Sequence, residues 1–362
     1  MKLGIIGLPS AGKTTIFNAL TKGNAPTGQS MGGRFDVLTA VVDVQDERVD
    51  ILSAMFKPKK TTYARITYTD VAGLQKGANE SGGLSGELLN HLSGLDGFVQ
   101  VVRAFESAVV PHPDGSVDAV RDLADLDMEF LLNDMGVVER RIQKLQEGLA
   151  RNAFADKKAA QAELTLFEAI NAALSEERPL REFPLTDEQE KSLRGFGLLT
   201  LKPKVVIFNI GDDQDEITLD YKHKLTVVTN LRGKLEMELA QLSAEGDEES
   251  LAMFMEEYGV AELSLDRVIR LSYDLMGLQS FFTVGEDEVR AWTVQTGATA
   301  VEAAGVIHTD LMKGFIRAET VAYADLIAAG SLPAARTAGK LRQEGKTYIM
   351  QDGDVINVKF NL

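Results

Sequence analysis

The stretch Gly7-Leu8-Pro9-Ser10-Ala11-Gly12-Lys13-Thr14 decides the fold, because it matches G-x-x-x-x-G-K-[ST], the pattern of a phosphate-binding loop. Residues 2–6 before it form a short apolar run that suits a buried parallel strand, and residues 15–20 after it have helical spacing. Strand, glycine loop and helix thus occur in the order that the motif requires. The sequence predicts a nucleotide-binding loop here, against the alternative of a chance glycine turn before a helix.

The loop residues have distinct expected roles toward a nucleotide. Glycines let successive backbone N–H groups point inward around a β-phosphate, and the amino terminus of the following helix adds partial positive charge. Lys13 is expected to reach the β- and γ-phosphates, which makes it catalytic as well, and the Thr14 hydroxyl is expected to bind Mg²⁺. The predicted nucleotide-binding residues of the loop are Pro9, Ser10, Ala11, Gly12, Lys13, Thr14 and Thr15.

Composition narrows the class of protein. A chain of 362 residues is long enough for two or three domains, and its net charge of −16 argues against a general nucleic-acid coat, so any contact with rRNA must be local. The absence of cysteine excludes disulfides, thiolate metal sites and a cysteine nucleophile. No stretch of about 18 apolar residues could span a membrane, and the amino terminus leaves no room for a signal peptide. We expect a cytoplasmic, monomeric protein with no membrane contact.

The chain contains three regions with different sequence patterns. Up to about residue 106, short apolar strands alternate with helical segments, which is typical of an α/β fold with a parallel sheet. Apolar residues then recur at helical spacing and predict two long helices in an antiparallel hairpin, after which strand character returns at residues 204–208. Strands dominate from residue 278, and Asp352-Gly353-Asp354 predicts a hairpin turn between strands 347–350 and 355–360. The expected domains are a P-loop NTPase domain (1–116 and 200–277), an inserted helical hairpin (117–199) and a β-rich domain (278–362).

A second nucleotide motif follows the predicted strand at residues 66–69. Asp70-Val71-Ala72-Gly73 has the form D-x-x-G, in which Asp70 would hold Mg²⁺ through water and the Gly73 N–H would bind a γ-phosphate. The alternative is an ordinary glycine-rich loop. In Ras-like enzymes the next residue is a glutamine that orients the attacking water, whereas this chain has Leu74, so hydrolysis needs another group, a cation or a partner. Slow intrinsic turnover is the expected consequence.

A third motif, Asn209-Ile210-Gly211-Asp212, follows the apolar strand at residues 205–208. GTPases place N-K-x-D here, and the Asp carboxylate accepts hydrogen bonds from guanine. Asp212 could do so, but Ile210 replaces the lysine whose stem packs on the base. Asn209, Ile210 and Asp212 are therefore predicted base-site residues, with a plain turn at the strand end as the alternative.

Together these motifs resemble the YchF or Obg-like ATPase family of P-loop NTPases, over nearly the whole chain. Besides the phosphate loop, the matching stretches are residues 70–78, 101–106, 199–203, 288–293, 297–300, 307–310, 313–319 and 352–357. The resemblance implies an α/β NTPase domain with an inserted helical hairpin and a carboxyl-terminal TGS domain, a ubiquitin-like β-grasp module. It also implies that ATP is hydrolysed at least as readily as GTP, and that the protein associates with the ribosome.

The chain departs from the family pattern at some positions. Arg34 stands where the family has its switch threonine, Asp212 stands where the family has the glutamate of N-x-x-E, and Thr229-Asn230-Leu231 replaces a small base loop. These changes leave base preference and turnover open. In the resemblance a histidine occupies the place of His112, beyond the strand at residues 98–104, so His112 is expected to assist hydrolysis, against the alternative of a solvent-exposed loop residue.

The predicted function is a nucleotide-dependent switch that hydrolyses ATP or GTP with Mg²⁺ and binds the ribosome in translation or stress regulation, with residues 278–362 as the partner-binding module. A hydrolysis-deficient nucleotide-binding scaffold is the alternative that Arg34 and Leu74 favour. A P-loop metabolic kinase would need a phosphate-acceptor pocket and an arginine-rich lid, which the sequence does not indicate.

Overall fold

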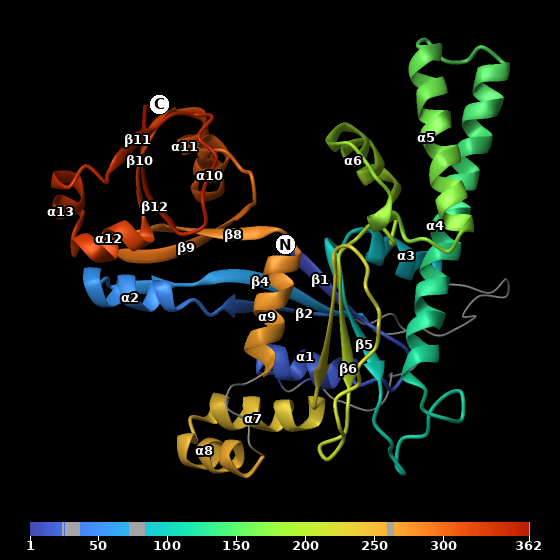
Figure 1. Cartoon of the computed structure of the whole chain (residues 1–362), viewed down its shortest axis with the longest axis horizontal. Coiled ribbons are helices and arrows are strands. Elements are labelled where there is room, and N and C mark those ends of the chain that lie inside the picture. Colours follow the sequence, from blue (N-terminus) through green and yellow to red (C-terminus); the bar gives the residue numbers. More distant parts are fainter. Residues whose placement is uncertain (24, 26–36, 72–83, 259–263, 362) are drawn as a thin grey trace. The chain divides into compact units, whose positions relative to one another are not determined.

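The computed structural model describes residues 1–23, 25, 37–71, 84–258 and 264–361 of the chain (Figure 1). These residues divide into two compact units, each made of two chain segments. The first unit contains Met1–Ala40 and Thr67–Leu265, and the second contains Val41–Ile66 and Asp266–Leu362. Among the described residues, no helix is long and apolar enough to cross a bilayer.

The first unit is built on a six-stranded sheet in the order β2-β4-β1-β5-β6-β7. Strand β1 pairs in parallel with both β4 and β5, and β6 pairs in parallel with β5 and β7. The strands are β1 (Lys2–Ile6), β2 (Val37–Val44), β4 (Ala64–Val71), β5 (Gly97–Arg103), β6 (Lys204–Asn209) and β7 (Thr226–Leu231). All residues of β5 and β6 are buried, as expected for apolar strands covered on both faces. The parallel pairing brings the carboxyl ends of β1, β4, β5 and β6 to one edge.

Helices cover this sheet. Helix α3 and the first part of α4 pack on it through a core that contains Leu88, Leu92, Phe98, Leu126 and Phe130, while α1 packs against α7. The helices of this unit are α1 (Lys13–Thr21), α3 (Gly86–Ser93), α4 (Ala119–Ala150), α5 (Lys157–Ser175), α6 (Asp187–Leu193), α7 (Gly233–Glu245) and α8 (Glu248–Glu257), with short 3₁₀ turns at Leu180–Glu182 and Arg194–Phe196. The fold is therefore the predicted α/β fold with a P-loop sheet.

The long helices α4 and α5 form an antiparallel pair that projects beyond the sheet (Figure 1). Each begins at an aspartate cap, Asp118 and Asp156, whose carboxylate accepts backbone N–H groups of the first turn. The buried Asp134 of α4 accepts the N–H of Leu199 at 2.9 Å and of Thr200 at 2.7 Å, which ties the helix to the segment that leads into β6. These N–H donors replace the hydrogen bonds to water that the carboxylate loses when it is buried.

The second unit has a mixed six-stranded sheet in the order β11-β10-β12-β8-β9-β3. Antiparallel β8 and β9 form a hairpin, β12 runs parallel to β8, and α10 packs on the sheet through Ala300, Ala303 and Ala304. The strands are β3 (Lys60–Thr62), β8 (Leu278–Thr283), β9 (Glu288–Gln295), β10 (Phe315–Ala322), β11 (Arg342–Glu344) and β12 (Asp354–Phe360). The helices are α2 (Glu47–Phe56), α9 (Ser264–Leu275), α10 (Ala300–Ile307), α11 (Thr309–Lys313), α12 (Tyr323–Ala329) and α13 (Leu332–Thr337).

One feature of this unit differs from the sequence-based expectations. The predicted strand at residues 347–350 is wrong, because this segment makes only an isolated bridge between Ile349 and Thr299, so Asp352 and Gly353 do not join two neighbouring strands. The second unit also contains the segment Val41–Ile66, which includes helix α2 and strand β3. Its strand β3 adds in parallel to β9, and Arg48 of α2 donates from Nη1 to Asp352 at 2.6 Å.

Candidate functional site

The loop between β1 and α1 is shaped by two glycines with positive φ, Gly7 at 152° and Gly12 at 92°. A Cβ atom on Gly7 would lie 2.2 Å from the carbonyl oxygen of Val101, and one on Gly12 would lie 2.2 Å from the side-chain nitrogen of Asn209. No other residue fits at either position. These two glycines of the motif therefore allow the loop to pass directly against β5 and β6.

Lys13, the first residue of α1, turns its ammonium group back into this loop. Its Nζ donates to the carbonyl oxygens of Gly7 at 3.0 Å and Leu8 at 2.9 Å. Desolvation lowers the pKa of Lys13 to about 8, while the charge of Asp70 acts in the opposite direction. The group is thus mainly cationic at neutral pH, and two neutral carbonyls hold it where an anionic ligand would be the stronger partner.

The two residues predicted to bind Mg²⁺ are in direct contact. Thr14 Oγ1 donates to Asp70 Oδ2 at 2.7 Å. Asp70 is only 4% exposed, and its Oδ1 has no hydrogen-bonding partner among the described residues. Burial raises the pKa of Asp70, opposed by the Thr14 hydrogen bond and then by the Lys13 charge. An unpaired buried carboxylate oxygen beside a hydroxyl suits a hard divalent cation, because Mg²⁺ prefers oxygen ligands.

Asn209, at the end of β6, connects two loops of the site. Its amide nitrogen donates to the carbonyl oxygen of Ala11 at 3.0 Å, and its amide oxygen accepts the N–H of Gly233 at 3.0 Å. Asn209 is buried, and both ends of its amide are used. It therefore holds the phosphate loop against the start of α7.

The other predicted base-site residues have different surroundings. Ile210 is 4% exposed and packs in a core cluster with Val102 and Phe208, so it would have to leave this cluster to contact a base. Asp212 is half-buried in the loop after β6, and its carboxylate has no partner in the part of the chain that the structure describes. Asp212 therefore remains free to accept hydrogen bonds.

The structure adds Phe105, which the motifs did not indicate. Its ring lies 3.9 Å from the Cβ position of Gly12, its own Cβ lies 4.0 Å from that of Gly211, and the Arg103 guanidinium stacks over the ring at 4.6 Å. The ring is half-buried between the phosphate loop and the predicted base loop. Its position just beyond the end of β5, at the edge where Asp70 and Asn209 end their own strands, was the signal that could have identified it.

His112 is buried, with 8% of the residue exposed, so the alternative of a solvent-exposed loop residue is wrong. Its Nδ1 accepts the backbone N–H of Asp114 at 3.1 Å, so Nε2 carries the proton and donates to Asp122 Oδ2 at 2.7 Å. Both ring nitrogens are engaged within the protein. In this arrangement neither can accept a proton from water, and assistance in hydrolysis would require the ring to leave its partners.

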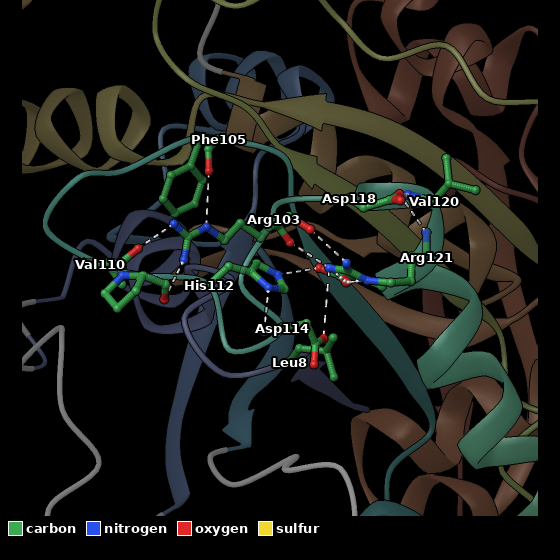
Figure 2. A network of polar contacts seen from close by, with 12 residues as sticks. Leu8, Arg103, Phe105, Val110, His112, Asp114, Asp118, Val120 and Arg121 are labelled. Carbon is green, nitrogen blue, oxygen red and sulfur yellow. Dashed lines mark hydrogen bonds and ion pairs between the residues drawn. The ribbon is translucent and has the colours of Figure 1, made fainter.

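Two arginines donate hydrogen bonds to the loop that carries His112 and to its neighbours (Figure 2). Arg103, only 2% exposed, donates to the carbonyl oxygens of Phe105 at 3.2 Å, Val110 at 2.7 Å and Pro111 at 3.5 Å. Arg121 donates to Asp122 Oδ1 and to the Ser116 carbonyl oxygen, each at 2.8 Å.

The buried polar side chains around the loop between β5 and α4, Arg103, His112 and Asp122, are therefore all paired within the protein. Asp122 also lines a narrow space beside Gly7 and Leu8, so this network lies directly against the phosphate loop.

Three residues of the sequence-based predictions lie outside the described residues. They are Arg34, Gly73 and Leu74. The expected γ-phosphate contact of Gly73 and the roles of the other two stay predictions.

Comparison with protein families matches both ends of the chain. Residues 2–166 match the family model MMR_HSR1, described as "50S ribosome-binding GTPase", and residues 278–361 match YchF-GTPase_C, described as a protein of unknown function. The first match includes the phosphate loop and the D-x-x-G motif, and the second covers the carboxyl-terminal segment.

Full-length relatives show the same relationship. The chain is 40% identical to "Ribosome-binding ATPase YchF" of Bacillus subtilis (strain 168), over 99% of each chain. It is 36% identical to "Obg-like ATPase 1" of Caenorhabditis elegans, over 100% of this chain and 92% of the other. Its structure is similar to that of the Schizosaccharomyces pombe YchF GTPase, with a TM-score of 0.85 and 33% identity, covering 99% of this chain and 97% of the other.

Proposed function

Because the chain belongs to the YchF family, we propose that it is a P-loop NTPase that hydrolyses ATP or GTP slowly and uses the bound nucleotide to control its association with the ribosome. The observation that carries the nucleotide part is the arrangement of Lys13, Thr14 and Asp70. A mainly cationic ammonium group, a hydroxyl and a carboxylate oxygen that has no partner among the described residues lie together beside a glycine loop. This set matches the needs of a metal-bound polyphosphate.

Each of these groups has a separate task in the proposal. Lys13 exchanges its carbonyl partners for β- and γ-phosphate oxygens, which adds charge to the hydrogen bonds and so strengthens them. Thr14 and Asp70 would hold Mg²⁺, directly and through water respectively. The ion neutralises charge on the phosphates when it is bound. Gly73 is proposed to contact the γ-phosphate and so to report whether it is present.

For the base, we propose that Phe105 stacks on it and that ATP binds at least as well as GTP. A half-buried aromatic ring beside the phosphate loop suits any base, because every base has a π-face. GTPases pack the stem of a lysine on the base at the position of Ile210. Because Ile210 is packed in the core, it does not replace that contact. Asp212 is the contrary feature, since its free carboxylate could accept guanine N–H groups.

Slow turnover has two causes in this proposal. Leu74 cannot hydrogen-bond to water, and His112 has both nitrogens engaged with Asp114 and Asp122. We propose that ribosome binding releases His112 so that it can position or deprotonate the attacking water. The engaged histidine equally favours the second candidate function, a nucleotide-binding scaffold that does not hydrolyse.

The remaining assignments concern the domains and the partner. We propose that residues 278–362 form a TGS domain that contacts the ribosome, that the hairpin of residues 117–199 is an insertion in the NTPase domain, and that the protein is cytoplasmic and monomeric. Contact with rRNA would be local because the chain carries a net charge of −16. Deleting residues 278–362 is a poor test, since it would also remove the strand that pairs with β3.

Steady-state phosphate release from ATP and from GTP, with and without 70S ribosomes, tests the proposal. Slow release that ribosomes accelerate supports the switch. Tight nucleotide binding without release under either condition would favour the scaffold. Phosphate transfer to a small-molecule acceptor would make the protein a kinase.

A further inference from the structure

We propose that a cavity in the second unit is a binding site for a small organic anion. The cavity lies between α13 and the strands β10 and β12 and has a volume of about 570 Å³. Pockets for small molecules occupy about 300–1,000 Å³ and combine apolar walls with a few placed polar groups. The apolar wall here consists of Val284, Leu332, Pro333, Leu341, Val355 and Ile356.

The polar side of the cavity is organised by Glu319, whose side chain is only 15% exposed. Its carboxylate accepts hydrogen bonds from Arg336 Nη2 at 3.1 Å and Gln343 Nε2 at 3.2 Å, and it pairs with Lys359 Nζ at 3.3 Å. These contacts, the Gln343 hydrogen bond first, hold the pKa of Glu319 below its ordinary value, so it stays ionised.

With three donors on one carboxylate, Glu319 positions the two cationic side chains rather than serving as a free acceptor. Two positive charges and one negative charge line the cavity, so its polar side is net positive in a chain of net charge −16. The site therefore favours an anion.

The neighbouring strand positions independently indicate a negatively charged ligand. Arg317 of β10 lies directly opposite Lys359 of β12, and like charges at opposed positions destabilise a sheet. Arg317 has no hydrogen bond or ion pair in the described part of the chain. Asn357, which lies opposite Glu319 and lines the cavity, likewise has no partner for its side-chain amide among those residues. An anion bound beside Lys359 would offset its repulsion from Arg317, which is exposed and lies outside the cavity lining, and it would accept a hydrogen bond from the Asn357 amide.

The lining also limits the chemical class of the ligand. The forked donors of a guanidinium match the two oxygens of a carboxylate or phosphate, and the ammonium group adds a point charge. An inorganic anion would leave the apolar wall uncovered. The ligand is therefore an organic carboxylate or phosphate, with one or two negative charges and an apolar body.

The test uses 4-fluorophenyl phosphate and 4-fluorobenzoate as probes, and fluorine relaxation reports their binding to the full chain. We expect saturable binding of at least one probe with a Kd on the order of 1 mM, as suits a ligand of this size. The tighter probe identifies the anionic group. The titration is repeated with the Lys13→Ala variant, and unchanged affinity there separates the cavity from the phosphate loop.

Two variants and a matched control complete the experiment. Arg336→Gln should weaken binding about 10-fold or more by removing a charge-assisted contact, and Leu341→Trp should block the apolar part while keeping the charges. Lys346→Gln makes the same charge change at an exposed position outside the cavity and should have no effect. Thermal unfolding confirms that each variant is folded. Equal affinities of Arg336→Gln and Lys346→Gln, loss of binding in Lys13→Ala, or no saturable binding in the parent would overturn the proposal.

Discussion

The phosphate loop and the loop between β5 and α4 lie against each other at one edge of the same sheet, yet they treat their polar groups in opposite ways. Among the described residues of the phosphate-loop site, Lys13 donates its hydrogen bonds to neutral carbonyls, and Asp70 Oδ1 has no hydrogen-bonding partner. In the other loop, Arg103 and Arg121 use their donors on carbonyls and on Asp122, and His112 is paired at both nitrogens. One loop is arranged to receive a ligand, and the other is closed on itself.

This difference separates binding from turnover. A site with unsatisfied groups gains free energy when a ligand supplies partners, whereas a satisfied network must lose hydrogen bonds before its groups can act. Binding of the nucleotide phosphates should therefore depend on the first loop. Hydrolysis should depend on opening the second, which a partner could supply.

The largest expected effect is on nucleotide affinity. Lys13→Ala removes a charge-assisted contact to the phosphates of the kind worth about 1.5–3 kcal/mol, so affinity should fall roughly 10- to 150-fold. Titration calorimetry with Mg²⁺ and a non-hydrolysable nucleotide measures it. Lys144→Ala, at an exposed position on α4, is the matched control and should bind like the parent. Unchanged affinity in Lys13→Ala would mean that this loop is not the nucleotide site.

The second effect concerns turnover and not binding. His112→Ala should lower ribosome-stimulated phosphate release about tenfold or more, at or below the lower end of general-base effects, and leave nucleotide affinity nearly unchanged. Single-turnover measurements with ribosomes present give the rate.

Since removing the imidazole also takes a hydrogen-bond donor from buried Asp122, urea unfolding must show that the variant remains folded. Val109→Ala changes a residue of the same loop that is 89% exposed and should have no effect. Equal single-turnover rates for His112→Ala and the parent would make His112 a purely structural residue, and the contrast between the two loops would then concern stability alone.

The third prediction uses the pKa of Lys13. Its value of about 8 in the free site should rise when phosphates bind, so affinity should be constant below pH 8 and fall up to about tenfold per unit above it. The free energy of unfolding changes with pH in the opposite direction to the nucleotide affinity. The unfolded chain binds more protons between about pH 8 and 10.5, so titration of Lys13 makes the folded state more stable as pH rises through that window.

A Lys13→Arg variant keeps the charge without titrating in this range and isolates the effect. Lys202 and Lys204 also have pKa values of about 8 because of burial, and they contribute equally to parent and variant. If the two proteins show the same pH dependence of nucleotide affinity from pH 7 to 10, Lys13 is not the group that meets the phosphates.

The sequence predicted the half of this comparison that is local. The phosphate loop is a contiguous motif whose glycines, lysine and threonine act within one turn, and the parallel strands follow from apolar runs alone. The closed loop could not be predicted in the same way. The buried His112 donates to Asp122 of the next helix, and Arg103 of the preceding strand donates to the Val110 carbonyl oxygen of the same loop. No motif in the sequence links these residues.

The second unit shows the same limit. Its strands were predicted from β-type residues and turns, but the addition of β3 to its sheet joins segments more than 200 residues apart. The hairpin expected at residues 352–354 failed because Tyr348 and Met350 exchange backbone hydrogen bonds with Ala300 and Ala298 instead of an adjacent strand. The cavity between α13 and β12 likewise depends on residues that are distant in the sequence.

The smallest expected effect concerns the base, which lies at the boundary between the two loops. If Phe105 supplies the stacking and Ile210 stays in the core, ATP and GTP should differ by less than about tenfold, roughly 1.4 kcal/mol. Asp212→Ala should then change the affinity for GTP less than about threefold and leave ATP unaffected, with the exposed neighbour Asp213→Ala as control. Competition of both nucleotides against one fluorescent analogue measures the ratios. If GTP is preferred more than tenfold and Asp212→Ala removes this preference, the Asp212 carboxylate accepts guanine N–H groups. Base selection would then depend on a group that has no partner before the nucleotide binds, as in the phosphate loop.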